Sequence, residues 1–199
     1  MAEIHVKSNN SVGQLDAIFR NSRRRASLRS LSYSIILPSY SPMRWFKLPS
    51  RRERLENDTV FTRELRNLFT KLHAYDKEYG GPPFRLEFGA VSPMDSFEPP
   101  PIKSINEGTG RERNENTYIY LNPAAQDPLP LLAKVVSFEE NKRWQRKLHP
   151  TILGLILRSL PALENFSWQF DGPEVRLLNL RQNIRTCESS LLSNAIVLF

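Results

Sequence analysis

Cysteine and long apolar runs are nearly absent from this sequence. Its 199 residues include a single cysteine, Cys187, which cannot form an internal disulfide, as is typical of chains kept in the reducing cytoplasm or nucleus. No apolar run approaches the roughly 18–20 residues that span a bilayer, and the first residues lack the apolar core of a secretory signal. We therefore expect neither a disulfide nor a membrane segment.

Residues that carry catalysis or bind metals are equally scarce. The three histidines, His5, His73 and His149, stand far apart. They share no ligand spacing with Cys187, whereas a zinc site needs about four convergent ligands. Cys187 falls on an apolar stripe of helical spacing, where a buried and inert thiol is the simpler interpretation.

Two further patterns fail to indicate chemistry. Gly108-Thr109-Gly110 has no predicted strand before it and no predicted helix after it, so it does not match a phosphate-binding loop. Glu139 and Glu140 are adjacent, and in a strand their carboxylates would point to opposite faces. The sequence thus predicts no catalytic residue, no metal ligand and no cofactor, and we do not expect an enzyme.

The composition is that of one folded domain. Hydrophobic residues make up 40% and charged residues 25%, with a formal net charge of +7. These values exclude wholesale disorder, and the length suits one domain with a sizeable core. We expect a polar, partly helical segment over 1–30, a domain over 31–194 and a tail over 195–199. Residues 92–116 lose all periodicity and predict a disordered insertion.

Period-two alternation predicts strands, and apolar residues three and four apart predict helices. The strands expected are Leu31–Leu37, Phe84–Val91, Thr117–Leu121, Lys134–Glu140 and Glu164–Phe170. The helices expected contain Leu15 and Phe19; Phe61, Leu65, Leu68 and Leu72, capped by Asp58; Ile152, Leu153, Ile156, Leu157 and Leu160, beginning at Pro150; and Leu177, Leu180, Ile184, Cys187 and Leu191.

The order of these elements indicates an α/β fold. Strands separated by helices favour parallel pairing, because a parallel neighbour requires a crossover. The strands alternate, whereas strands covered by helices on both faces are apolar throughout. We therefore expect short, irregular strand–helix units like those of leucine-rich repeats, with a sheet open on one face. A sheet covered by helices on both faces would contradict this prediction.

The open face of such a sheet would be a polar surface on rigid strands, as solenoids use for binding proteins. A plain solvent-facing surface without a partner is the alternative. The residues expected on this face, and proposed to bind a protein partner, are Ser32, Ser34, Arg85, Glu87, Ser137, Glu139, Asn165, Ser167 and Gln169.

Positive charge is concentrated in three clusters, two of which are Arg23–Arg29 and Arg51–Arg54. The third brackets an aromatic ring, so its side chains could hold a nucleic-acid backbone and stack one base. A solvated basic turn with Trp144 packed inward is the alternative, since no nucleic-acid-binding module accompanies it. The residues of this third cluster are Lys142, Arg143, Trp144, Arg146 and Lys147.

Four segments of the sequence form a distinctive pattern by their order along the chain. They are Ser34–Tyr40 (SIILPSY), Phe61–Leu72 with its Leu68-Phe69 pair, Arg85–Ser96 (RLEFGAVSPMDS) and, after Leu129 and the basic stretch, Leu148–Phe170 (LHPTILGLILRSLPALENFSWQF). In that order they resemble the region after the F-box in a group of filamentous-fungal F-box-type proteins. The group shares an LP-x-Y strand end, a Leu-Phe helix, a Leu-Glu strand ending in Ser-Pro-x-Asp, an Arg-rich turn and a helix closing with Leu-Pro-x-Leu-Glu.

The resemblance covers about Gln14 to Phe170 and implies a binding scaffold. In that group an N-terminal F-box of three helices would bind the Skp adaptor of a cullin–RING ubiquitin ligase, and the leucine-rich-repeat-like remainder would hold a substrate. The 13 residues before Gln14 cannot form three helices, so contact with the Skp adaptor is not expected. After Trp168, Asp171-Gly172-Pro173 replaces the aromatic and basic ending of the group. The chain thus resembles a substrate-side fragment.

The function expected is a non-enzymatic protein-interaction module, similar to a substrate receptor, in the fungal cytoplasm or nucleus. Its protein partner is not specified by the sequence, and no membrane partner is expected. Two alternatives stay open at this point. One is a nucleic-acid-binding protein that uses the basic 142–147 surface, and the other is a truncated remnant without activity.

Overall fold

The chain folds around a parallel sheet that is built strictly in chain order. The computed structural model describes residues 2–44, 47–95, 117–122, 127–140 and 146–168, and all structural statements concern these residues. Residues 1–167 form one unit, and residues 168–199 form a second, of which only Trp168 is described. No helix of the described chain is long and apolar enough to cross a membrane.

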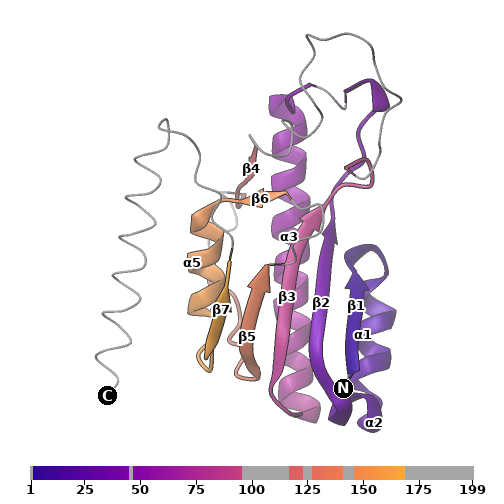
Figure 1. Cartoon of the computed structure of the whole chain (residues 1–199), viewed down its shortest axis with the longest axis vertical. Coiled ribbons are helices and arrows are strands. Elements are labelled where there is room, and N and C mark those ends of the chain that lie inside the picture. Colours follow the sequence, from indigo (N-terminus) through magenta and orange to yellow (C-terminus); the bar gives the residue numbers. More distant parts are fainter. Residues whose placement is uncertain (1, 45–46, 96–116, 123–126, 141–145, 169–199) are drawn as a thin grey trace, which may run out of the picture. The chain divides into compact units, whose positions relative to one another are not determined.

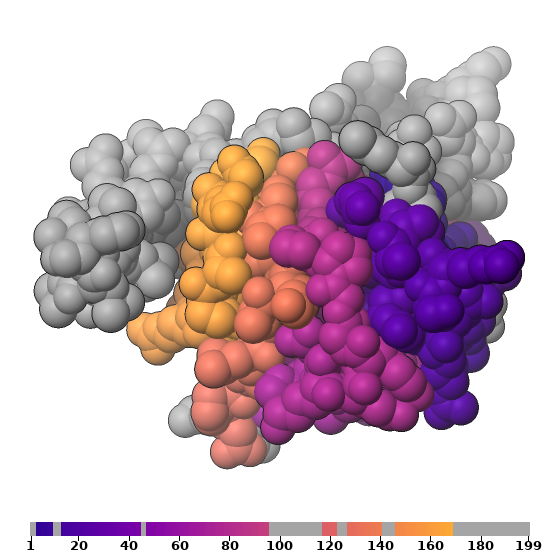
Figure 2. Space-filling model, turned by 90° about the horizontal axis from the view of Figure 1, so that it is seen from below, coloured from indigo at the N-terminus to yellow at the C-terminus, as the bar shows by residue number. Residues whose placement is uncertain are grey.

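Five strands form the central sheet in the order β1-β2-β3-β5-β7. They are β1 (Ala2–Lys7), β2 (Leu28–Ile36), β3 (Phe84–Val91), β5 (Val135–Glu140) and β7 (Asn165–Ser167), and every pair is parallel. Figure 2 shows the consequence: the colours pass from indigo to yellow across the width of the molecule.

The strand order determines on which face of the sheet the helices lie. They are α1 (Ser11–Phe19), α2 (Ser22–Ser27), α3 (Arg51–Tyr79) and α5 (Pro150–Arg158), with short 3₁₀ turns η1 (Ser8–Asn10) and η2 (Pro42–Arg44). Crossovers between parallel strands are right-handed, so a sheet that grows in one direction carries its helices on one face. Figure 1 shows α3 behind the sheet on that face. The prediction of an α/β fold with a central parallel sheet is confirmed.

The covered face of the sheet holds the core. Alternate positions of β2 and β3 are fully buried there, and Phe88 is 0% exposed. Its ring meets Phe61 of α3 edge to face at 5.9 Å and lies 6.3 Å from Phe138 of β5. Phe138 in turn stacks on Phe166 of β7 at 6.3 Å. An aromatic row therefore crosses the sheet beneath α3.

Helix α3 begins earlier than the sequence pattern predicts. Ser50 is the N-cap, and with Glu53 it forms a capping box in which each side chain binds the other's backbone N–H. The prediction that Asp58 caps the helix is wrong, because Asp58 lies inside α3 and accepts a hydrogen bond from the Tyr120 N–H at 2.9 Å. The helix ends at Gly80, whose φ of +60° favours glycine.

The N-terminal segment, expected to be polar and partly helical over 1–30, contributes a strand to the sheet. β1 pairs with β2 over its whole length, so the domain does not begin at residue 31. The expected helix with Leu15 and Phe19 is present as α1, and both side chains are buried. A six-residue strand at an edge carries too few alternations to distinguish it from a polar segment.

Two more expectations need correction. Thr117–Leu121 contributes only β4 (Tyr118–Ile119), which pairs with β6 (Lys147–Leu148) in a separate two-stranded sheet. Residues 92–95, expected within the disordered insertion, instead form a turn in which Asp95 is buried. The rest of that insertion, the turn at 171–173, the last helix with Cys187 and the tail over 195–199 lie outside the described residues.

Candidate functional site

The open face, which is the face of the sheet opposite α3, carries polar side chains in register. Because neighbouring strands are parallel and paired residue by residue, these side chains line up in two rows that cross the strands. The first polar row comprises Glu3, Ser30, Arg85, Ser137 and Asn165, and the second comprises His5, Ser32, Glu87, Glu139 and Ser167.

Arg85 connects the two polar rows. Its Nη2 donates to Glu87 Oε1 at 2.8 Å, and its Nη1 lies 3.5 Å from Glu139 Oε1. The Ser137 hydroxyl donates to the same Glu139 oxygen at 3.3 Å. The guanidinium is 40% exposed, so these ion pairs contribute little stability. Their effect is to fix the position of two carboxylates and one cation on rigid strands.

The structure brings together most of the residues that alternation predicts for this face. Eight of the nine lie on it, either in the two polar rows or, for Ser34, farther along β2 between Lys7 and Gly89. Gln169 lies outside the described residues. Sequence reasoning missed Glu3 and His5 because it missed β1, and it missed Ser30 because it began β2 three residues late. Whether this face binds a partner stays a prediction.

A second constellation lies at the carboxyl ends of β2 and β3 and is buried. The Arg146 guanidinium donates two hydrogen bonds to the Asp95 carboxylate, Nε to Oδ2 at 2.9 Å and Nη2 to Oδ1 at 2.6 Å. The Tyr40 hydroxyl donates to Asp95 Oδ1 at 3.1 Å, and the Arg146 guanidinium lies over the Tyr40 ring. The two side chains of the ion pair are only 2% and 0% exposed.

This buried cluster joins loops that are far apart in sequence. Ser92 donates its hydroxyl to the Pro38 carbonyl at 2.9 Å and its N–H to Asp95 Oδ2 at 2.8 Å. The Arg146 N–H donates to the Ala90 carbonyl at 3.0 Å. The loop after β2, the turn after β3 and the segment before β6 are thereby held together. Among the described residues, the ion pair presents no charged group to solvent, and the contacts of the cluster are those that join these loops.

The predicted nucleic-acid surface is wrong at Arg146. A buried guanidinium committed to Asp95 cannot contact a phosphate backbone. Lys147 lies half-buried in β6, where it pairs with Tyr118 of β4. Lys142, Arg143 and Trp144 lie outside the described residues. The described part of the chain therefore gives this surface no support.

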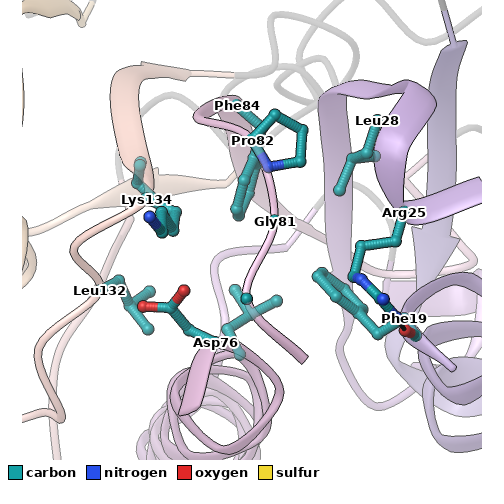
Figure 3. A pocket seen from close by; sticks show the side chains of 12 residues that line it. Phe19, Arg25, Leu28, Asp76, Gly81, Pro82, Phe84, Leu132 and Lys134 are labelled. Carbon is teal, nitrogen blue, oxygen red and sulfur yellow. Dashed lines mark hydrogen bonds between the residues drawn. The ribbon is translucent and has the colours of Figure 1, made fainter. Parts of the chain in front are cut away.

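A small pocket opens at the amino end of β3, between α3 and the strands (Figure 3). Its lining includes the apolar side chains of Phe84 and Leu132 and the charged side chains of Arg25, Asp76 and Lys134 (Figure 3). The cavity volume of about 20 Å³ is room for roughly one water molecule. The pocket is therefore too small to hold a metabolite.

The three histidines do not form a metal site. The described part of the chain contains no cluster of three His, Cys, Asp or Glu side chains suited to a metal ion. His5 lies on the edge strand, 3.8 Å from Glu3. His73 Nδ1 lies 2.8 Å from the Leu131 carbonyl oxygen. His149 is the N-cap of α5 and stacks on Tyr120, with ring centroids 4.4 Å apart.

Protonation of His149 is expected to destabilise the fold. Its Nδ1 accepts the Thr151 N–H and therefore must be neutral, and burial lowers the pKa of the imidazole below its ordinary 6.5. A histidine whose pKa is lower in the folded state makes its full contribution to stability above the unfolded pKa. That contribution is lost as the pH falls from the unfolded pKa through the folded one. Between pH 7.5 and 5 we expect a loss below about 1 kcal/mol, because a whole N-cap contributes about that much and His149 is only half-buried.

Urea unfolding of the His149→Asn variant checks this expectation. Asparagine caps helices well and does not titrate in this range, so the variant should be stable at pH 7.5 and lose less stability than wild type on acidification, by up to about 1 kcal/mol. An identical pH dependence of the two proteins would show that His149 stays neutral or does not cap α5.

Comparisons with known proteins give no relative: no family model matches the chain, and neither a curated protein nor a solved structure matches it significantly.

Proposed function

We propose that this protein is a non-enzymatic protein-interaction module that binds its partner through the open face. The observation that carries the proposal is the sheet itself, which grows in one direction and aligns two polar rows in register, exposed in part on β1, β3, β5 and β7 and buried at Ser30 and Ser32 of β2. Five strands about 4.8 Å apart give a face about 19 Å wide on a rigid support. Solenoids that stack strand–helix units use such surfaces to bind proteins.

The resemblance to the post-F-box region of fungal F-box-type proteins agrees with this proposal. Three of the motifs that carry it meet in the buried cluster: Tyr40 ends LP-x-Y, Asp95 ends Ser-Pro-x-Asp, and Arg146 belongs to the Arg-rich turn. The Leu68-Phe69 pair of the helix motif is also buried. These motifs thus maintain a scaffold, and a substrate-receptor-like role in the cytoplasm or nucleus follows as part of the proposal.

Charge reversal on the open face tests the proposal. We expect Glu139→Lys to reduce recovery of specific partners at least tenfold in quantitative affinity purification from fungal cells, because it puts a like charge beside Arg85 and changes the second polar row next to Glu87, its central residue. Asn165→Lys, at the β7 end of the first polar row, should act in the same direction. Interface centres dominate binding energy, so the Glu139 variant should have the larger effect.

The matched control is Glu78→Lys, which makes the same change of charge at an exposed position of α3. It should leave recovery unchanged. Equal recovery of the same proteins by all three variants and wild type would contradict binding through the open face. Thermal unfolding of each variant shows that the comparison is made between folded proteins.

A further inference from the structure

The amino-terminal part of α3 extends beyond the sheet. The 29 residues of α3 span about 43 Å, whereas the eight residues of β3 span about 26 Å. Figure 1 shows the first turns of α3 above the carboxyl ends of β2 and β3. Within α3, no residue before Phe61 is buried, so residues 51–60, called here the α3 overhang, add no buried side chain to the core, and Asp58 near their end accepts the Tyr120 N–H.

The turn η2 forms one surface with the α3 overhang. Arg44 of η2 pairs with Glu53 of the first turn, with Nη2 and Oε2 2.9 Å apart. Glu53 also accepts the Ser50 N–H, and Ser50 accepts the Glu53 N–H. The helix start is therefore already capped by the chain's own side chains. Any partner would meet the side chains of this surface and not the amides of the helix terminus.

This surface combines apolar and cationic side chains. Met43, Leu48 and Leu55 are 74%, 61% and 59% exposed, and they are half of the six large apolar side chains exposed in the described chain. Exposed charged residues neighbour them in the sequence, and four of these are basic, namely Lys47, Arg51, Arg52 and Arg54, against one exposed acidic residue, Glu56. Exposed apolar groups that gather within 13 residues of sequence and carry a rim of charge are typical of protein-binding sites.

The positions on the helix define the chemistry of the partner. Successive helix residues are about 100° apart, so Leu55 projects between Arg51 and Arg52 around the helix axis. A helix that binds a membrane surface instead separates its cations and apolar groups onto opposite faces. A phosphate backbone would match the cations but not Met43 or Leu48. The complement of this interleaved pattern is an apolar side chain flanked by carboxylates.

We propose that the α3 overhang and η2 bind an acidic amphipathic segment of a partner protein, in which leucine-like side chains contact Leu55, Leu48 and Met43 and carboxylates pair with the surrounding arginines. This interface is separate from the open face and does not depend on it. It would give the module a second binding surface, which attracts negative charge, whereas the carboxylates of Glu87 and Glu139 on the open face attract positive charge.

The test uses the full chain and a defined probe. The probe is a fluorescein-labelled 18-residue helical peptide of Glu and Leu with leucines at i, i+3, i+4 and i+7, followed by fluorescence anisotropy. We expect at least tenfold tighter binding than for a scrambled peptide of the same composition. Leu55→Glu, and the pair Arg51→Glu and Arg52→Glu, should each weaken binding at least tenfold. These positions are exposed, so the variants should fold.

Matched controls lie elsewhere on the chain. Leu131→Glu changes another exposed leucine, and the pair Arg23→Glu and Arg24→Glu reverses the same charge on α2, so both should bind the peptide as wild type does. Equal binding of the scrambled peptide, or no binding, would overturn the proposal. So would tighter binding to duplex DNA or to phosphatidylserine vesicles. Glu139→Lys should not affect this binding, so a failure here is distinguishable from a failure of the open-face proposal.

Discussion

Replacement of Asp95 by alanine is expected to lower the free energy of unfolding by about 3–5 kcal/mol, because it leaves a buried guanidinium without its counter-charge. Arg146 is 2% exposed, and its Nη1 already has no hydrogen-bond acceptor in the described chain. Removal of the carboxylate would leave Nε and Nη2 of the guanidinium without the two Asp95 oxygens that accept their hydrogen bonds. Folded domains are stable by only about 5–15 kcal/mol, so this loss is large.

The double variant Asp95→Leu with Arg146→Met separates the ion pair from the packing around it. Replacement of both charges by apolar groups of similar size is often neutral, because the desolvation cost of both ions disappears. We therefore expect the double variant to be more stable than Asp95→Ala, and a double-mutant cycle to show coupling of about 1–3 kcal/mol. Urea unfolding measures both quantities. If Asp95→Ala lost less than about 1 kcal/mol, the pair would not be buried in solution.

Alternation along the chain was enough to predict the centre of the fold. In β3 the pattern from Phe84 to Val91 gave both ends of the strand, and the covered and open faces followed from its period of two. The open face could be predicted for the same reason, because parallel strands in register place Arg85 beside Ser137 without any further information. The period of two can be recognised within a single strand, and every central strand of the sheet shows it.

The rest depended on contacts that periodicity does not encode. Arg146 stands in a run of basic residues, and nothing in that run distinguishes the one side chain that reaches Asp95, 51 residues away. The first ten residues of α3 bury nothing, so they show no apolar period. The start of α3 was nevertheless readable, since Ser50 and Glu53 have the spacing of a capping box.

Phe88→Ala should also cost about 3–5 kcal/mol of unfolding free energy, since a fully buried aromatic ring is removed and a cavity is left. Phe88 lies at the middle of the aromatic row, between Phe61 of α3 and Phe138 of β5. Its loss would therefore loosen the contact of the main helix with the sheet and of two strands with each other.

Phe166→Ala is the matched control, because it removes the same ring at the edge of the same row. Phe166 is 43% exposed and contacts only one of these rings, Phe138, so we expect a loss of about 1 kcal/mol, well below that at Phe88. Urea unfolding of both variants measures the difference. Equal losses would mean that the core does not centre on β3. A large loss at Phe88 alone would show that the strand carrying Glu87 is held by α3, so that the helix side of the sheet fixes the geometry of the open face.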